Sequence, residues 1–97
     1  MAVFGVLYSG MWYVYVLNSL KNGKNYIGTT GNLERRFAEH NTRSGGQYTS
    51  RNGPFKLIFY EAFLNKKDAG VQEKFYKTGY GREVLKEKLQ NYFESLR

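Results

Sequence analysis

The order of hydrophobic and polar residues along the chain predicts three short strands. Residues 12–17 and 55–63 are rich in aromatic and β-branched side chains, and a shorter run of the same kind covers residues 25–29. Between residues 12–17 and 25–29 lies Asn22-Gly23, a dipeptide typical of tight turns. These two runs therefore predict a β-hairpin, and residues 55–63 predict a third strand.

Helical periodicity predicts three helices. Thr30 or Asn32 can cap a helix that continues through His40, and a second helix over residues 66–77 follows another asparagine. A third helix over residues 82–96 begins after two glycines. Its apolar stripe consists of Leu85, Leu89, Tyr92 and Leu96. The predicted order is β-β-α-β-α-α, an α+β domain whose mainly antiparallel sheet is covered by helices.

Composition limits the chain to one domain with a modest core. It has 97 residues, of which 41% are hydrophobic and 18% aromatic, enough for it to fold alone. Because there is no Cys and only one His, thiolate and histidine-rich metal sites are excluded, and any metal must be a hard ion bound by oxygen. No apolar run approaches the roughly 20 residues that span a bilayer, and the first ten residues lack the basic start of a signal peptide. We expect a soluble, cytoplasmic protein that does not contact membranes.

An excess of positive charge points to a polyanionic partner. Lys and Arg number 15 against 8 Asp and Glu, and the isoelectric point is about 9.7. Nucleic acid is the most common partner of such a domain, although many small basic domains merely carry solvated lysines. Arginines gather in the centre of the chain and lysines in its C-terminal half. Since a guanidinium can bind phosphate through two hydrogen bonds, the two regions suggest different tasks.

The first predicted helix places two polar side chains beside its apolar stripe. Arg36 and His40 lie one turn apart, within the same arc as Leu33 and Phe37. This placement suits a phosphate held by a guanidinium with an imidazole nearby. It equally allows both side chains to lie at the edge of the stripe and reach solvent.

The second predicted helix leaves the direction of its carboxylate open. A face formed by Ala69 and Tyr76 would turn Glu73 toward the sheet, whereas a face formed by Val71 and Phe75 would turn it to solvent. The chain has no closely spaced acids of the kind that two-metal nucleases need. A metal site here would use one carboxylate, an arrangement that suits Mg²⁺.

Two tyrosines in the predicted hairpin have two possible roles. By default Tyr15 and Tyr26 pack in the sheet with their hydroxyls at its rim. If the hairpin is in register, both hydroxyls can instead face a common site.

Two short motifs at hairpin distance resemble the paired motif of the GIY-YIG nuclease family. Tyr13-Val14-Tyr15 and Tyr26-Ile27-Gly28 stand in corresponding places, and Arg36 follows ten residues after the second tyrosine. Further matching positions are His40, Asn41, Tyr60-Glu61-Ala62, Asp68-Ala69 and Glu73-Lys74. The match covers about residues 12–93 and is similar to the short stand-alone bacterial members. We therefore expect an N-terminal extension over residues 1–10 and a single nuclease-like domain over residues 11–97.

The resemblance implies a small three-stranded antiparallel sheet flanked by three helices, and metal-dependent hydrolysis of DNA phosphodiesters. On this pattern Tyr26 orients or deprotonates the attacking water, and Arg36 neutralises charge on the phosphoryl oxygens. Glu73 holds one divalent ion, Mg²⁺ or Mn²⁺. Tyr15 and His40 support the water or the leaving group. The expected nucleic-acid-binding side chains are Arg35, Arg43, Tyr48, Arg51, Lys74, Lys77 and Arg82, and Asn91 is a supporting catalytic candidate.

Departures from the family pattern bear on activity. Thr29 stands where the DNA-repair branch of the family places a lysine, so activation of Tyr26 is left to the metal and Arg36, and turnover is expected to be slower. The chain is expected to be an endonuclease directed by substrate shape, such as branched or single-stranded DNA, rather than by sequence. Its rivals are a non-catalytic nucleic-acid-binding module on the same scaffold and a structural adaptor. Retention of Tyr26, Arg36 and Glu73 together favours the enzyme, because binding alone has no need of a carboxylate beside phosphate.

Overall fold

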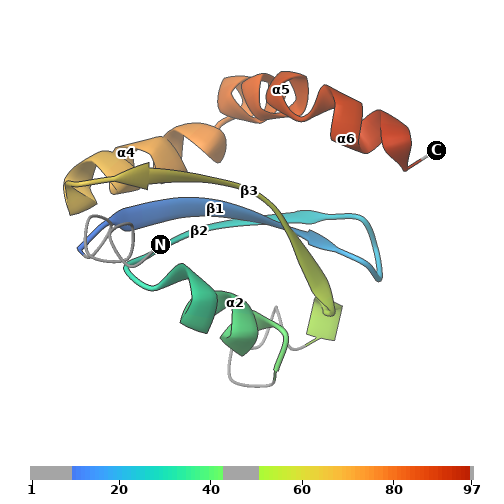
Figure 1. The fold of residues 1–97 in the computed structure, drawn as a ribbon. Coiled ribbons are helices and arrows are strands. Elements are labelled where there is room, and N and C mark those ends of the chain that lie inside the picture. Colours follow the sequence, from blue (N-terminus) through green and yellow to red (C-terminus); the bar gives the residue numbers. More distant parts are fainter. Residues whose placement is uncertain (1–9, 43–50, 97) are drawn as a thin grey trace.

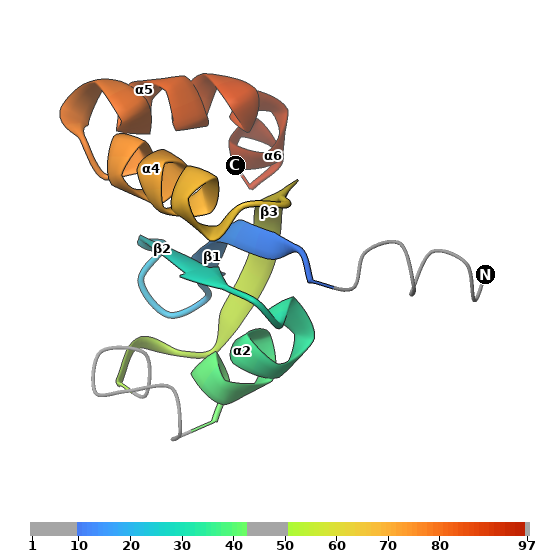
Figure 2. The ribbon, with the colours of Figure 1, turned by 90° about the vertical axis from the view of Figure 1, so that its left-hand side faces the viewer.

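A three-stranded antiparallel sheet separates two layers of helices in the described part of the chain (Figures 1 and 2). The computed structural model describes residues 10–42 and 51–96. The strands are β1 (Trp12–Ser19), β2 (Asn25–Thr30) and β3 (Phe55–Phe63), in the order β2-β1-β3. All three predicted strands and the α+β class are therefore confirmed, and β2 and β3 form the two edges.

The hairpin of β1 and β2 closes through the predicted turn. The Ser19 N–H donates to the Lys24 carbonyl at 2.9 Å, and the Gly23 N–H donates to the Ser19 carbonyl at the same distance. Gly23 has a φ of +75°, which glycine adopts without the steric cost of a side chain. The resulting register pairs Tyr15 with Gly28 and brings the middle of β1 beside the middle of β2.

Asparagine caps start two of the helices where the sequence predicts them. One helix, α2 (Leu33–His40), is preceded by Asn32, whose side chain accepts from the Arg35 N–H at 3.0 Å. The next, α4 (Lys66–Tyr76), is preceded by Asn65, whose side chain accepts from the Lys67 N–H at 2.8 Å. Each cap satisfies an N–H group that the helix itself leaves without a partner.

The prediction of one continuous helix over residues 82–96 is wrong, because the structure has two helices there. The structure has α5 (Gly79–Lys88) and α6 (Gln90–Ser95), separated at Leu89. Thr78 starts α5 by accepting from the Gly81 N–H at 2.9 Å, so both glycines lie inside the helix. A Cβ at Gly81 would collide with the Phe75 carbonyl oxygen, and glycine is therefore required for α5 to begin so close to the end of α4.

The two faces of the sheet carry separate apolar clusters. Val14 and Val16 point to the layer of α4 and α5, where they meet Ala69 and Tyr76. Tyr15, Leu17 and Phe55 form the other cluster, with side chains of α2 packed against it. Ala69 and Tyr76 are fully buried and Val71 is 67% exposed, so the first of the two faces considered for the second helix faces the sheet.

Hydrogen bonds among three side chains hold α4 against β3. The buried Tyr76 hydroxyl donates to Glu61 Oε1 at 2.6 Å. Gln72 Nε2 donates to the same oxygen at 3.0 Å and to the Tyr76 hydroxyl at 3.1 Å. Such satisfied buried groups hold an element in one position, and Glu73 lies next to Gln72 on the helix that they fix. Among the described helices, none has the length and apolar character needed to cross a membrane.

Candidate active site

Tyr15 lies at the centre of the candidate site, in the middle of β1. Its side chain is 1% exposed and extends across β2 over Gly28, whose missing Cβ leaves room for the phenol. The Tyr15 hydroxyl and His40 Nε2 are 2.8 Å apart in a buried hydrogen bond. The alternative in which His40 reaches solvent is therefore wrong, because the imidazole is 1% exposed and packs beneath the sheet.

Tyr26 completes a group of three rings on the α2 side of the hairpin. Its ring centroid is 4.8 Å from that of His40 and 6.5 Å from that of Tyr15. Tyr26 is half-buried, whereas Tyr15 is enclosed. The two tyrosines that the resemblance pairs thus meet in space, and Tyr26 is the one with access to solvent.

Arg36 lies one turn before His40 on α2 and borders the same group. Its Nη1 donates to Glu39 Oε1 at 3.0 Å, and both side chains are about one-third exposed. An ion pair at this exposure contributes little stability, about 0.2–1 kcal/mol. The guanidinium is also close enough to Tyr15 to oppose the effect of burial on that hydroxyl. Arg36 therefore faces the ring group and remains open to a ligand.

Burial dominates the protonation of the enclosed pair. Burial raises the pKa of Tyr15 to about 12, although Arg36 acts in the opposite direction. Burial also lowers the pKa of His40, and the positive charge of Arg36 lowers it further. His40 Nδ1 has no hydrogen-bond partner among the described residues. A neutral phenol and a neutral imidazole are thus the stable forms at neutral pH.

Glu73 approaches the site around the edge of β2. It belongs to α4, on the opposite side of the sheet from α2, and its Oε1 lies 3.4 Å from the hydroxyl of Thr29 on β2. Its Oε2 accepts from Lys77 Nζ at 2.8 Å. The negative charge of Glu73 contributes to the raised pKa of Tyr15, so the two groups interact across the strand. Arg36 and Glu73 therefore border one site from its two sides.

The donor set of the site suits a single hard cation. No group of three or more His, Asp or Glu side chains forms a metal cage within residues 10–42 and 51–96. Glu73, beside the Thr29 hydroxyl, is the carboxylate that this site offers. Mg²⁺ commonly takes one or two carboxylates, keeps several waters and binds substrate phosphate oxygens. The residues present fit an ion of this kind.

The remaining predicted residues lie in several parts of the fold. Arg35 and Lys74 are exposed on α2 and α4, and Arg51 is exposed before β3. Arg43 and Tyr48 lie outside the described residues, as do residues 1–9 of the expected extension. Asn91 is exposed on α6 and makes no hydrogen bond with the site residues described above.

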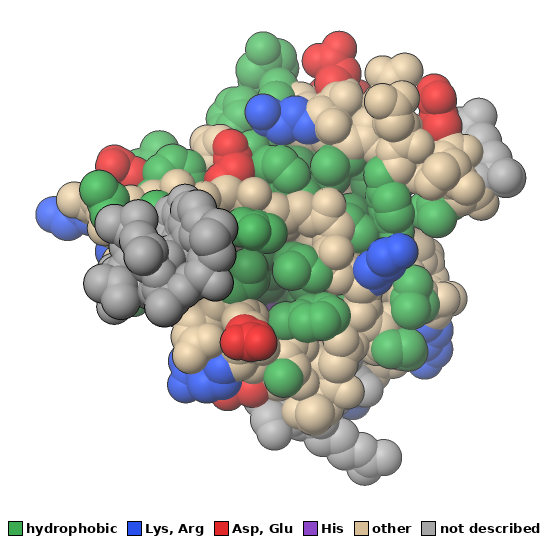
Figure 3. All heavy atoms as spheres, viewed as in Figure 1, with side chains coloured by type: hydrophobic (Ala, Val, Ile, Leu, Met, Phe, Trp, Pro, Cys, Tyr) green, Lys and Arg blue, Asp and Glu red, His purple; other side chains and the backbone are tan. Residues whose placement is uncertain are grey.

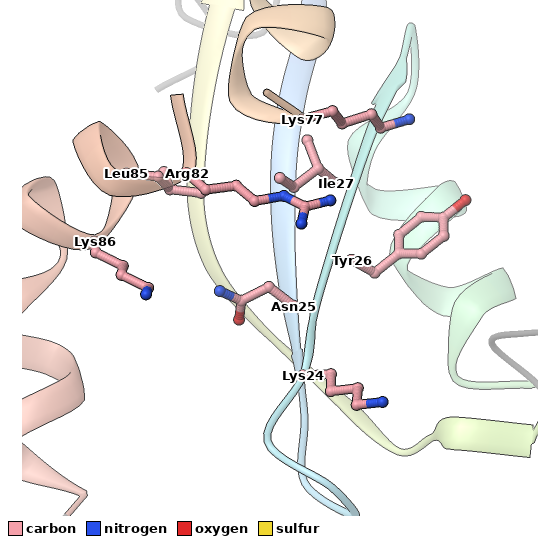
Figure 4. Close-up of a pocket in the computed structure, with 8 residues that line it drawn as sticks. All are labelled: Lys24, Asn25, Tyr26, Ile27, Lys77, Arg82, Leu85 and Lys86. Atoms are coloured by element: carbon pink, nitrogen blue, oxygen red, sulfur yellow. The ribbon is translucent and has the colours of Figure 1, made fainter. Parts of the chain in front are cut away.

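A basic groove borders the site on the side of α5 (Figure 4). It has a volume of about 480 Å³ and lies between β2 and the α4–α5 end of the other layer. Tyr26 is one of its lining residues, and its ring is turned away from α5, so the groove and the ring group meet at the edge of β2. Lys77, another lining residue, pairs with Glu73. Its lining side chains are Lys24, Asn25, Tyr26, Ile27, Lys77, Arg82, Leu85 and Lys86.

Sequence reasoning misses several of these features. The motif identifies Gly28 only as a matching residue, and the space that it leaves for Tyr15 depends on the strand register. The spacing of Glu73 and Lys77 by four residues is a signal for an ion pair on a helix that could have been used. Lys24 and Lys86 are distant in sequence, and no local pattern connects them.

Comparison with known proteins identifies the family of this chain. A model of the GIY-YIG catalytic domain matches residues 11–90. The chain belongs to the GIY-YIG family, a family of nucleases, which confirms the resemblance found in the sequence.

Its relatives include small bacterial proteins. The UPF0213 protein CPE1444 of Clostridium perfringens is 43% identical over 67 residues, which are 69% of this chain and 71% of that protein. A UPF0213 protein of Limosilactobacillus reuteri is 41% identical, over 71% of this chain and 73% of its own. The solution NMR structure of the UPF0213 protein BH0048 from Bacillus halodurans has 35% sequence identity and a TM-score of 0.49, covering 77% of this chain and 81% of that one.

Proposed function

We propose that this protein is a divalent-metal-dependent endonuclease that hydrolyses DNA phosphodiester bonds. The observation that carries the proposal is the meeting of Tyr15, Tyr26, Arg36 and His40 on one side of the hairpin, with Glu73 reaching the same strand from the other side. Phosphodiester hydrolysis requires positioning of water and stabilisation of negative charge, and these residue types supply both.

Each side chain has a role that follows from its environment. Tyr26, which has access to solvent, orients the attacking water or accepts its proton. Tyr15 is held protonated by burial, and its hydrogen bond with His40 fixes the direction of the hydroxyl, which supports the water or the leaving group. Arg36 binds the phosphoryl oxygens as negative charge develops on them. Water then forms the new bond to phosphorus as its proton passes to Tyr26 or to solvent, and the bond to the leaving oxygen breaks as that oxygen takes up a proton from solvent.

Glu73 is the residue that would hold the divalent cation, Mg²⁺ or Mn²⁺. When bound, such an ion neutralises charge on the scissile phosphate and the leaving oxygen. Lys77 pairs with Oε2 of Glu73 at 2.8 Å, so a bound ion would compete with this lysine for the carboxylate. Residue 29, which lies beside this carboxylate, is a threonine and carries no positive charge. Its neutral side chain supports the expectation of slow turnover.

The substrate is proposed to be selected by its shape. Specific DNA-binding modules bury roughly 600–1,000 Å² of protein surface or more. The catalytic groups and the basic groove already occupy the β2 side of this small domain. Branched or single-stranded DNA is therefore favoured over a defined base sequence.

The test is a titration of Mg²⁺ and of Mn²⁺ with single-stranded, duplex and branched DNAs of one length. We expect metal-dependent cleavage by the unmodified protein and none by Glu73→Gln, while the DNA affinity of Glu73→Gln is retained or slightly increased. Glu87→Gln, an equal change of charge at an exposed position of α5 outside the groove, is the control and should cleave normally. Binding without cleavage under every metal condition would instead identify a non-catalytic nucleic-acid-binding module, and undiminished cleavage by Glu73→Gln would exclude Glu73 as the metal ligand.

A further inference from the structure

The groove between β2 and α5 concentrates positive charge. Lys24, Lys77, Arg82 and Lys86 line it, and no acidic residue among those described does. In Figure 4, Arg82 and Lys86 reach from α5 toward β2, with Lys24 near the hairpin turn and Lys77 at the end of α4. On the face seen in Figure 3, by contrast, lysines and arginines are scattered among hydrophobic and neutral side chains. The cations of the groove therefore form a local cluster.

Two of these cations lack a partner within the part of the protein that the structure describes. Lys77 pairs with Glu73 and Lys86 pairs with Glu83 at 3.4 Å, but the side chains of Lys24 and Arg82 have neither an ion pair nor a hydrogen bond among the described residues. Arg82 and Lys86 are also four residues apart on α5, where like charges repel. An anion in the groove would compensate this repulsion.

The floor of the groove suits a nucleobase. Ile27 is half-buried and packs against the apolar cluster that contains the buried Leu85, so the floor is apolar. The Tyr26 ring lies beyond the edge of this floor and is turned toward α2 (Figure 4). Asn25 accepts from Asn18 Nδ2 through its Oδ1, and its own Nδ2 has no acceptor among the described residues. A positively charged groove that follows the backbone, with an aromatic ring beside it on which a base can stack, is the usual means of binding single-stranded nucleic acid, and Tyr26 provides such a ring at the edge of this groove. In a duplex the bases stay stacked inside and could not reach such a floor.

We propose that this groove binds a single-stranded segment of nucleic acid next to the scissile phosphate. Arg82, Lys86 and Lys24 contact its phosphates, and Ile27 contacts a base. The inference rests on the proposed function for its direction, since Tyr26 belongs to both the groove and the candidate active site. It explains how a domain of this size can prefer DNA with an unpaired strand over an intact duplex.

The test measures binding by fluorescence anisotropy in EDTA, so that it does not depend on cleavage. The probes are a blunt duplex, the same duplex with a five-nucleotide single-stranded overhang, and that duplex with an abasic overhang. We expect the unmodified protein to bind the overhang duplex most tightly and the abasic form less tightly. The double variant Arg82→Gln/Lys86→Gln should lose about tenfold in affinity for the overhang duplex and little for the blunt one, since each exposed charge contact contributes a few-fold.

The control is Lys67→Gln/Lys88→Gln, which removes the same charge from exposed positions outside the groove. It should weaken all probes equally and slightly. The salt dependence supplies a second readout, because each single-strand phosphate that a variant no longer binds should reduce the log–log slope by about 0.7. Equal binding of blunt and overhang duplexes by the unmodified protein, or equal weakening in the two double variants, would overturn the inference. Absence of cleavage with a retained overhang preference would overturn the proposed function alone.

Discussion

The Tyr15 hydroxyl lies so close to Gly28 that a Cβ at residue 28 would be 2.6 Å from its oxygen and 2.8 Å from its Cζ. The hydrogen bond between this hydroxyl and His40 depends on that space. A single missing side chain on β2 therefore determines where the central phenol of the site lies. The glycine of the Tyr-Ile-Gly motif thus has a steric role in the site as well as a place in the strand.

Gly28→Ala should displace Tyr15 and break its hydrogen bond with His40. We expect a loss of about 1–3 kcal/mol in the free energy of unfolding, as for other overpacked sites, together with a strong loss of cleavage. Urea unfolding and single-turnover cleavage measure the two effects. Gly70→Ala on α4 is the control, because a Cβ there meets nothing within 4 Å, and it should stabilise the protein by about 0.5–1 kcal/mol. Normal cleavage by Gly28→Ala would show that the position of Tyr15 is unimportant.

The sequence allowed most of the fold to be predicted, because local signals fix its elements. The turn at Asn22 and Gly23 and the asparagine caps act within a few residues, so they work without knowledge of the tertiary structure. The division of the last predicted helix at Leu89 could not be predicted in the same way. Its apolar stripe continues across the break, and the close approach of Gly81 to Phe75 depends on how α4 and α5 pack.

The candidate site was only partly predictable for the same reason. The resemblance supplied Tyr15, Tyr26, Arg36 and Glu73, but helical periodicity alone left two directions open for Glu73. Burial of the neighbouring face of α4 decides between them, and that burial depends on the whole sheet. The basic groove joins side chains from the hairpin turn and α5, and no sequence window contains both.

Tyr26→Phe tests whether the Tyr26 hydroxyl activates water. The ring would stay packed against His40, so thermal unfolding should change little while the cleavage rate falls. The rate of the unmodified protein should rise toward alkaline pH, and this rise should disappear in the residual activity of Tyr26→Phe. Tyr15→Phe is the matched control: because burial raises the pKa of Tyr15 to about 12, its removal should lower the rate without changing the shape of the pH profile between about pH 6 and 10. An unchanged alkaline rise in Tyr26→Phe would assign the titration to another group.

Arg36 should act on the transition state more than on substrate binding. Its guanidinium faces the ring group and can contact two phosphoryl oxygens at once, which a lysine cannot do. Arg36→Ala should therefore lower kcat by about a hundredfold, and Arg36→Lys by less. Glu39→Gln keeps the guanidinium and removes only its exposed ion pair, so kcat should change little. A raised KM with unchanged kcat in Arg36→Ala would make Arg36 a binding residue.

His40 should make the folded protein sensitive to mild acid. Burial and then Arg36 lower its pKa from the ordinary value of 6.5, so the unfolded chain binds a proton more readily than the folded one. The free energy of unfolding should therefore be greatest above pH 6.5 and fall as the pH drops below that value, by at most about 1.4 kcal/mol per pH unit for this one group. Urea unfolding between about pH 7.5 and 5.5 measures this slope.

The matched variant for this titration is His40→Gln, which keeps a polar side chain opposite the Tyr15 hydroxyl but cannot take up a proton in this range. At about pH 7.5 the variant should be the less stable protein, because it loses the packing of the imidazole against Tyr15 and Tyr26. Its stability should depend less on pH, so the difference between the two proteins should shrink toward about pH 5.5. Carboxylates titrate mainly below this window, and any that contribute act on both proteins equally. Parallel curves would mean that His40 gains no proton on unfolding, and the buried neutral imidazole would then be the wrong description of the site.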